Sequence, residues 1–277
     1  MLKEKARIDH SHENTDLMTV RKLTKRFDDL TAVDSMSFGV HYQECFGLLG
    51  VNGAGKSTTF RMLCGDLLPS SGNAYLHQGR FSLLDNLRSY EQNIGYCSQE
   101  SALLGKMTGE EMLYLFARLR GIPDAVMKRD IDNLIRMTGM EDQADKLIES
   151  LSGGNRRKLH LALSMVGSPS ICFLDEPTSG VDPVARRKIW QALGYMKRLN
   201  SSIVLTSHVS FLLMFRTFSP IPNFYFAVNG GVRSPLLSHR HHGQRPLLLH
   251  GLAAAPSLQV RPGLHGDHQS AKDPGNR

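Results

Sequence analysis

The feature that most constrains this chain is the glycine-rich segment GVNGAGKST at residues 50–58. It follows a short apolar run and precedes a predicted helix over residues 58–65. The segment fits the pattern G-x-x-x-x-G-K-[ST], in which glycines let backbone N–H groups turn inward around phosphate oxygens and the helix N-terminus adds positive potential. In such a loop Lys56 reaches the β- and γ-phosphates, and the Ser57 hydroxyl ligates Mg²⁺. The segment therefore predicts a site for nucleotide phosphates and Mg²⁺, formed by Gly50, Asn52, Gly53, Ala54, Gly55, Lys56, Ser57 and Thr58.

Four short apolar runs indicate the central strands of a parallel sheet. Runs of this length, apolar on both faces, suit strands that are covered by helices on each side. Ligands of open α/β sheets bind beyond the carboxyl ends of the strands, and each run is followed by polar or glycine-rich residues at that end. The runs are Cys45–Leu49, Ile94–Cys97, Ile171–Leu174 and residues 203–205.

Helix signals fill the stretch between the second and third runs. A capping box, T-G-E-E at residues 108–111, starts one amphipathic helix, and a second is predicted over about residues 125–138. Farther on, Asp182 is a predicted N-cap with Pro183 at the first helical position. The chain is thus predicted to be α/β, with a helical block over about residues 105–165 inserted into the core.

Two adjacent carboxylates, Asp175 and Glu176, directly follow the third apolar run. Asp175 is the candidate for the Mg²⁺ shell, and Glu176 is the candidate to orient or deprotonate an attacking water. An Asp-Glu pair can also simply end a strand in solvent. The phosphate-loop pattern upstream and the Pro177-Thr-Ser turn that follows favour the functional interpretation.

Charge and cysteine content exclude several classes of protein. The net charge is +7, but residues 209–277 hold seven Lys/Arg against two Asp, which leaves 26 basic and 24 acidic side chains in residues 1–208. A nucleic-acid binder carries its basic surface on the folded domain, so nucleic acid is not an expected partner. The four scattered cysteines are typical of reduced thiols. No apolar run reaches the ~18 residues of a membrane span, and the first 16 residues lack the apolar core of a secretion signal.

The motifs together, over residues 20–208, resemble the ATP-binding cassette of ABC transporters. Beside the phosphate loop, LSGGN at residues 151–155, LDEPTSGVD at 174–182 and TSH at 206–208 match that family. The stretches ECFGLLGVNGAGK and SGGNRRKL look more narrowly like subfamily A, whose members move lipids and sterols, and the former like its C-terminal cassette. The resemblance implies a P-loop NTPase fold: a RecA-like parallel core with an N-terminal antiparallel β edge and an inserted helical subdomain.

The resemblance also assigns roles to individual residues. Phe27 stands where an aromatic ring stacks on adenine, although a core phenylalanine is the alternative. Gln99 matches the loop glutamine that touches Mg²⁺ and faces the membrane domain, Asp182 matches the loop that links two sites, and His208 matches the switch histidine on the γ-phosphate. The residues implied to contact the γ-phosphate bound by an opposite cassette are Ser152, Gly153 and Gly154.

The expected function is that of an ATP-binding and ATP-hydrolysing cassette that powers transmembrane transport of lipids. Its implied partners are a second cassette, paired head to tail, and transmembrane domains that this chain lacks. It would work on the cytoplasmic face of a membrane, or in the cytoplasm as this chain alone. An alternative is a truncated isoform or fragment that binds nucleotide or a partner cassette without turnover. Cassettes that act on ribosomes or DNA fit poorly, because only 96 positions separate Lys56 from Ser152 and no second phosphate loop is present.

Domain boundaries follow from changes in composition. Residues 1–18 are polar and predicted to be a linker, and residues 19–210 are predicted to form the cassette. The family pattern breaks after His208, and residues 211–277, rich in proline and histidine, are predicted to be a divergent, disordered tail. Only FAVNG at residues 226–230 resembles the next strand of the family.

Overall fold

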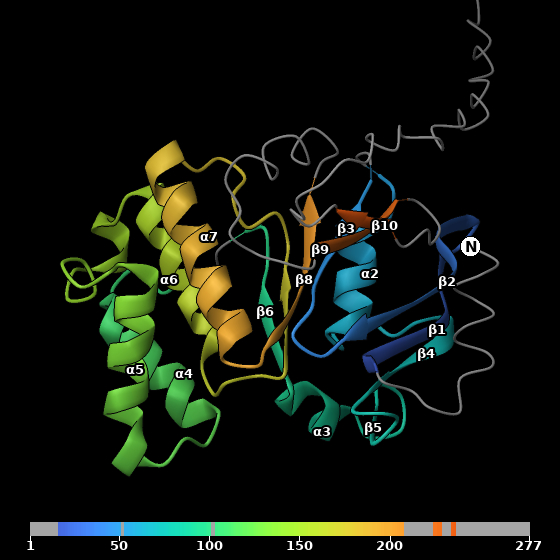
Figure 1. Cartoon of the computed structure of the whole chain (residues 1–277), viewed down its shortest axis with the longest axis horizontal. Coiled ribbons are helices and arrows are strands. Elements are labelled where there is room, and N and C mark those ends of the chain that lie inside the picture. The colour runs from blue at the N-terminus through green and yellow to red at the C-terminus, as the bar shows by residue number, and fades with distance from the viewer. Residues whose placement is uncertain (1–15, 51–52, 101–102, 208–223, 229–233, 237–277) are drawn as a thin grey trace, which may run out of the picture. The chain divides into compact units, whose positions relative to one another are not determined.

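A computed structural model describes residues 16–50, 53–100, 103–207, 224–228 and 234–236. These ranges all belong to the first of two units of the chain, residues Met1–Ser238. Two sheets organise this unit (Figure 1): a six-stranded sheet in the order β10-β9-β3-β8-β7-β6 and a four-stranded sheet in the order β2-β1-β4-β5.

The centre of the six-stranded sheet is parallel, as predicted. β3 (Cys45–Leu49) and β7 (Ile171–Leu174) both pair in parallel with β8 (Ser202–Ser207), and β6 (Ile94–Cys97) pairs in parallel with β7. Each of the four strands coincides with or contains one of the predicted apolar runs, so these predictions are confirmed. Because the strands are parallel, their carboxyl ends meet at one edge of the sheet, where the predicted site residues begin.

Two further strands extend this sheet beyond residue 210. β9 (Phe224–Val228) pairs in parallel with the outer side of β3, and β10 (Ser234–Leu236) pairs antiparallel with β9. The prediction of a disordered tail over residues 211–277 is therefore wrong for these two segments. The physical reason is that β3 would otherwise leave its outer N–H and C=O groups unpaired, and the sequence FYFAV has high strand propensity.

The four-stranded sheet confirms the predicted antiparallel N-terminal edge. It consists of β1 (Asp16–Phe27), β2 (Leu30–His41), β4 (Ser71–Leu76) and β5 (Phe81–Ser82). The predicted linker over residues 1–18 is wrong for its last three residues, which belong to β1. Leu17 and Met18 are at most 1% exposed and both belong to the hydrophobic core.

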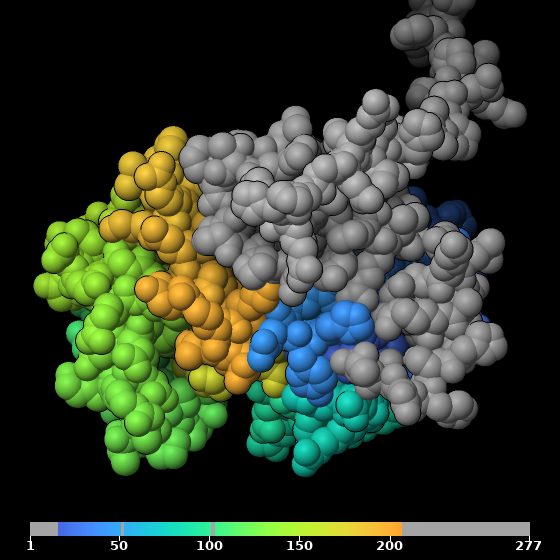
Figure 2. All heavy atoms as spheres, in the orientation of Figure 1, coloured from blue at the N-terminus to red at the C-terminus, as the bar shows by residue number. Residues whose placement is uncertain are grey.

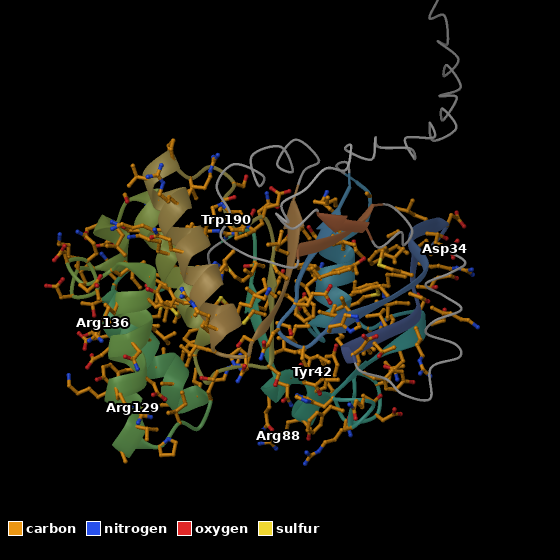
Figure 3. All side chains as sticks on the ribbon, in the orientation of Figure 1. Asp34, Tyr42, Arg88, Arg129, Arg136 and Trp190 are labelled. Carbon is orange, nitrogen blue, oxygen red and sulfur yellow. The ribbon has the colours of Figure 1, made fainter. Side chains whose placement is uncertain are left out.

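Each face of the parallel sheet packs against a different set of elements, as its alternating side chains show. On β7, Ile171 and Phe173 join α2 and the antiparallel sheet in one hydrophobic cluster, in which Phe60 meets Phe173 edge to face at 5.4 Å between ring centroids. Cys172, on the opposite face, joins a second cluster with α6 and α7, which includes Trp190 (Figure 3). The strands are thus buried on both faces, which is why their sequences are continuously apolar.

The helical block lies where the sequence predicts it. Thr108 and Glu111 form the expected capping box, and Asp182 caps α7, whose first residue is Pro183.

In Figures 1 and 2 the helical block (green) lies against α7 (orange), and α6 belongs to both the block and the layer of helices that covers the sheet. No helix within the described ranges is both long and apolar enough to cross a bilayer. The helices are α2 (Lys56–Leu63), α3 (Leu87–Gln92), α4 (Gly109–Leu119), α5 (Asp124–Thr138), the 3₁₀ turn η1 (Ile148–Ser150), α6 (Gly153–Met165) and α7 (Pro183–Arg198).

Candidate functional site

The predicted phosphate loop joins β3 to α2, and glycine is required at two of its positions. Gly53 and Gly55 both have φ of +79°, a left-handed conformation that favours glycine. A Cβ at Gly55 would also lie 2.4 Å from the carbonyl oxygen of Ala32. The loop residues Val51 and Asn52 lie outside the described residues, whereas Ala54 and Thr58 are half-buried at the start of α2.

Helix α2 begins at Lys56, two residues earlier than predicted, with Gly55 as its N-cap. Since Gly55 has no side chain, no side chain at the N-cap satisfies the first N–H groups of α2. The Lys56 side chain is 8% exposed, and its Nζ donates to the carbonyl oxygen of Gly50 at 2.9 Å, across the loop. Ser57 is exposed at the same helix end. The local geometry therefore combines the first N–H groups of a helix, an ammonium group and a hydroxyl, a set of donors that suits phosphate oxygens.

Asp175 and Glu176 follow β7 at the same sheet edge, and a hydroxyl from β8 joins them. Asp175 is 3% exposed, and its N–H donates to the carbonyl oxygen of Cys97 at 2.8 Å. Thr206 Oγ1 donates to Asp175 Oδ1 at 2.5 Å and accepts from the Glu176 N–H at 2.9 Å. Glu176 has a φ of +46°, an uncommon left-handed conformation for glutamate that this hydrogen bond helps to hold.

Thr206 is a site residue that the sequence reasoning missed. Two signals pointed to it, its place at the end of the apolar run 203–205 and the motif TSH at residues 206–208, but only His208 of that motif was given a role. Its contact with Asp175 spans 31 residues and depends on the pairing of β7 with β8. His208, the predicted switch histidine, lies outside the described residues.

Gln99 follows β6 and is exposed beside this carboxylate turn. Its carbonyl oxygen accepts a hydrogen bond at 3.0 Å from Arg157, and Arg157 also donates to the carbonyl oxygens of Asp175 and Glu176. The structure therefore brings Gln99, Asp175 and Glu176 together through the backbone. Arg157, like Thr206, is absent from the predicted site residues.

The glycine-rich start of α6 forms a second group with α7. Ser152 caps α6 by accepting from the Asn155 N–H at 3.3 Å, and it is exposed together with Gly153. A Cβ on Gly154 would lie 3.0 Å from both Ala185 Cβ and Asp182 Oδ2, so a larger residue here would have to displace these two side chains slightly. Asp182 itself accepts from the backbone N–H groups of Val184 and Ala185, at 3.0 and 2.9 Å.

Phe27 ends β1 and belongs to neither group. Its side chain is 42% exposed, so the alternative that it is a core phenylalanine is wrong. The ring is covered on one side by Lys25, whose Nζ lies 5.1 Å from the ring centroid. An exposed aromatic face of this kind can stack on a planar ligand.

Burial controls the titratable groups behind the site. It raises the pKa of the Cys97 thiol to about 11, although the nearby Arg157 charge opposes this shift. Burial, and to a smaller extent the Arg157 charge, lower the pKa of His160, on α6, to about 4. Within the described ranges no cluster of three His, Cys, Asp or Glu side chains could hold a metal ion. Protein side chains of these types therefore form no closed metal site in this part of the chain.

Comparison with known proteins connects this geometry to a family. Residues 33–179 match the family described as ABC transporter. The chain is 44% identical over 194 residues to phospholipid-transporting ATPase ABCA3 of Mus musculus, covering 69% of this chain and 11% of that protein. It is 46% identical over 208 residues to ATP-binding cassette sub-family A member 7 of Mus musculus, covering 74% and 10%. The chain thus spans about a tenth of the length of these curated relatives.

Solved structures show the same fold. An ATP-binding subunit of an ABC transporter is 25% identical and superposes with a TM-score of 0.69, covering 79% of this chain and 90% of that one. The cbiO1 protein of Clostridium perfringens, described as part of an ABC transporter complex, superposes with a TM-score of 0.67 at 24% identity, covering 78% and 85%. The predicted fold class, a P-loop α/β core with an antiparallel β edge and an inserted helical subdomain, is confirmed.

Proposed function

Because the chain belongs to the ABC transporter family and its curated relatives are subfamily A members, we propose that it is the ATP-binding and ATP-hydrolysing cassette of a lipid transporter. The observation that carries this proposal is that the Lys56 loop and the Asp175-Glu176 pair lie at the same edge of the sheet. The loop directly follows β3, and the carboxylate pair directly follows β7. Lys56 is already held across its loop, so its ammonium group needs little reorganisation to meet a phosphate.

The donor set fits Mg²⁺. The Ser57 hydroxyl, the Asp175 carboxylate and the Gln99 amide oxygen are hard oxygen ligands, which Mg²⁺ prefers, usually as a few protein groups completed by substrate phosphates and water. When bound, Mg²⁺ would neutralise charge on the β- and γ-phosphates. In this proposal Thr206 holds the Asp175 carboxylate in place, since its hydroxyl donates to Oδ1.

Hydrolysis would proceed by in-line attack of water on the γ-phosphate, which breaks the bond from the γ-phosphorus to the β–γ bridging oxygen and releases ADP and phosphate. Glu176 orients this water and accepts its proton, while Lys56 stabilises the charge on the phosphate oxygens. We assign His208 to the γ-phosphate and Phe27 to the adenine ring on the family resemblance, which the exposure of Phe27 supports.

The proposed partners are a second cassette and transmembrane domains, at the cytoplasmic face of a membrane. Ser152 and Gly153 are exposed at the α6 N-terminus, where their backbone N–H groups can meet a phosphate bound by the opposite cassette. Asp182, beside Gly154, would link the two sites through α7. Two copies of this chain could form such a pair with two-fold symmetry.

The first test is ATP binding to the full chain by equilibrium titration with Mg²⁺ present. Lys56→Ala should weaken binding about 10- to 100-fold, as expected for loss of hydrogen bonds to charged phosphate worth ~1.5–3 kcal/mol. Lys128→Ala is the matched control, because Lys128 lies on α5 with its side chain 75% exposed and pairs with Asp132 on the same helix. Equal affinity of a folded Lys56→Ala variant and the parent would refute the assignment.

The second test separates binding from turnover. Glu176→Gln should keep ATP affinity, abolish hydrolysis and trap a paired state with ATP between cassettes. Turnover per molecule of the parent should rise with protein concentration, because each complete site needs a second copy. Binding without any turnover at high concentration would favour the alternative of a nucleotide-binding fragment.

A further inference from the structure

Arg157 lies in the second turn of α6 and is 6% exposed. Its side-chain hydrogen bonds go to backbone carbonyl oxygens on two separate segments, which follow β6 and β7. A guanidinium group has five N–H donors, and Arg157 makes five hydrogen bonds, one for each donor. They are Nε to Pro177 at 3.1 Å, Nη1 to Ser98 at 2.6 Å and Gln99 at 3.0 Å, and Nη2 to Asp175 at 2.6 Å and Glu176 at 3.0 Å.

These hydrogen bonds lie where the backbone ladder between β6 and β7 stops, and they take the place of further ladder hydrogen bonds. The parallel ladder between β6 and β7 ends at the pair Cys97–Leu174, followed by the bond from the Asp175 N–H to Cys97. Beyond it, the two segments separate to form the Gln99 loop and the carboxylate turn. The planar guanidinium bridges that separation, with Nη1 on one segment and Nη2 on the other. It therefore fixes the distance between them as a continued ladder would have done.

A buried cation in this place is expensive unless its donors are all satisfied. The next residue, Lys158, is also buried, at 4% exposed, but its Nζ donates at 2.9 Å to Gly139, the residue after α5. Lys158 thus caps a helix, whereas Arg157 joins two segments that carry proposed ligands. Of these two adjacent buried cations, Lys158 therefore has a structural role, and Arg157 has a role in positioning the proposed ligands.

We propose that Arg157 is a positioning residue of the ATPase reaction, which fixes Gln99 against the Asp175-Glu176 turn and so sets the spacing of the Mg²⁺ and water ligands. The inference rests on the proposed function. Arg157 does not touch nucleotide in this proposal; it acts only through the backbone of the residues that do. Residues that orient metal ligands typically change metal affinity 10- to 100-fold when they are replaced.

The test compares Arg157→Met with Lys158→Met in the full chain, since each removes one buried cation from α6 and keeps an apolar stem. Thermal unfolding, ATP affinity in EDTA and the Mg²⁺ concentration that half-restores tight ATP binding are measured for both. Both variants should unfold at lower temperature and keep ATP affinity in EDTA within about twofold, because the Lys56 loop is unchanged. Only Arg157→Met should raise the half-saturating Mg²⁺ concentration, by about tenfold or more.

Arg157→Lys is the second variant and guards against misfolding of Arg157→Met. It keeps the charge but lacks the planar fork, so it should raise half-saturating Mg²⁺ in the same direction by a smaller factor, about threefold. Hydrogen exchange should become faster in residues 97–100 and 175–179 of both Arg157 variants and stay unchanged there in Lys158→Met. Parental Mg²⁺ dependence in Arg157→Lys, or an equal shift in Lys158→Met, would overturn the proposal. A parent chain that does not bind ATP would instead refute the proposed function.

Discussion

Replacing Thr206 by valine tests the hydrogen bonds that hold the carboxylate turn. Valine has nearly the shape of threonine, so Thr206→Val removes the hydroxyl with little change in packing around a side chain that is 0% exposed. Two hydrogen bonds disappear with it: the donation to Asp175 Oδ1 and the acceptance from the Glu176 N–H. The Asp175 oxygen and the Glu176 N–H are then left without that partner.

The expected cost follows from the two groups. A hydrogen bond to a charged group contributes ~1.5–3 kcal/mol, and leaving a buried N–H unsatisfied costs ~1–3 kcal/mol. Because the Glu176 N–H is only partly buried, the lower part of its range applies. We therefore expect the free energy of unfolding to fall by about 2–5 kcal/mol, which corresponds to a melting temperature lower by roughly 5–15 °C for a domain of this size.

Urea unfolding of the full chain measures this loss, with Thr206→Ser as the matched control. Serine keeps the hydroxyl and loses one buried methyl group, which costs about 1 kcal/mol. Thr206→Val should therefore be clearly less stable than Thr206→Ser. If the valine variant were as stable as the serine variant, the hydroxyl would not hold the turn, and the reasoning about Asp175 and Glu176 would be wrong.

Three further predictions concern the core around this site. Gly95→Ala should unfold the domain or lower its melting temperature sharply, because a Cβ there would lie 1.9 Å from the carbonyl oxygen of Ser164 on α6; circular dichroism melting against a Gly194→Ala control, which meets nothing within 4 Å, checks this. Since burial and, to a smaller extent, the Arg157 charge lower the pKa of His160 from 6.5 to about 4, the unfolded chain binds more protons between these values. Stability should thus fall as pH drops from 6.5 to 4, and His160→Leu should flatten urea-unfolding free energies over that window. Burial raises the pKa of the Cys45, Cys97 and Cys172 thiols, which are all buried, so at pH 8 these three should react with a thiol reagent only after denaturation, and fast labelling of any of them in the native chain would contradict this.

The parts of the fold that could be predicted are those in which local sequence and burial agree. β7 reads as a strand because Phe173 and Cys172 face opposite apolar clusters, so the whole segment is apolar. The start of α4 reads as a cap because Thr108 and Glu111 satisfy each other's backbone N–H groups only three residues apart. Such features need no knowledge of distant residues.

The parts that could not be predicted depend on partners far away in the chain. β9 had only the resemblance of residues 226–230 as a signal, because it is short and its position is set by β3, some 179 residues earlier at the pair Cys45–Phe224. In the sequence, Arg157 is one of several cations at the start of a basic helix. Its role becomes visible only from the packing of α6 against the ends of β6 and β7. The roles of Phe27, Gln99 and Asp182 came from the family resemblance and remain predictions.

The pairing of β9 with β3 has a consequence for dividing this chain into fragments. β3 leads into the phosphate loop, and β9 covers its outer side over the full length Cys45–Leu49. A fragment cut after β8 would turn β3 into an edge strand, with a row of free N–H and C=O groups that can recruit a strand from another chain. Such a fragment would tend to self-associate through the strand that anchors the loop, and its oligomers would be easily mistaken for nucleotide-driven pairing of cassettes.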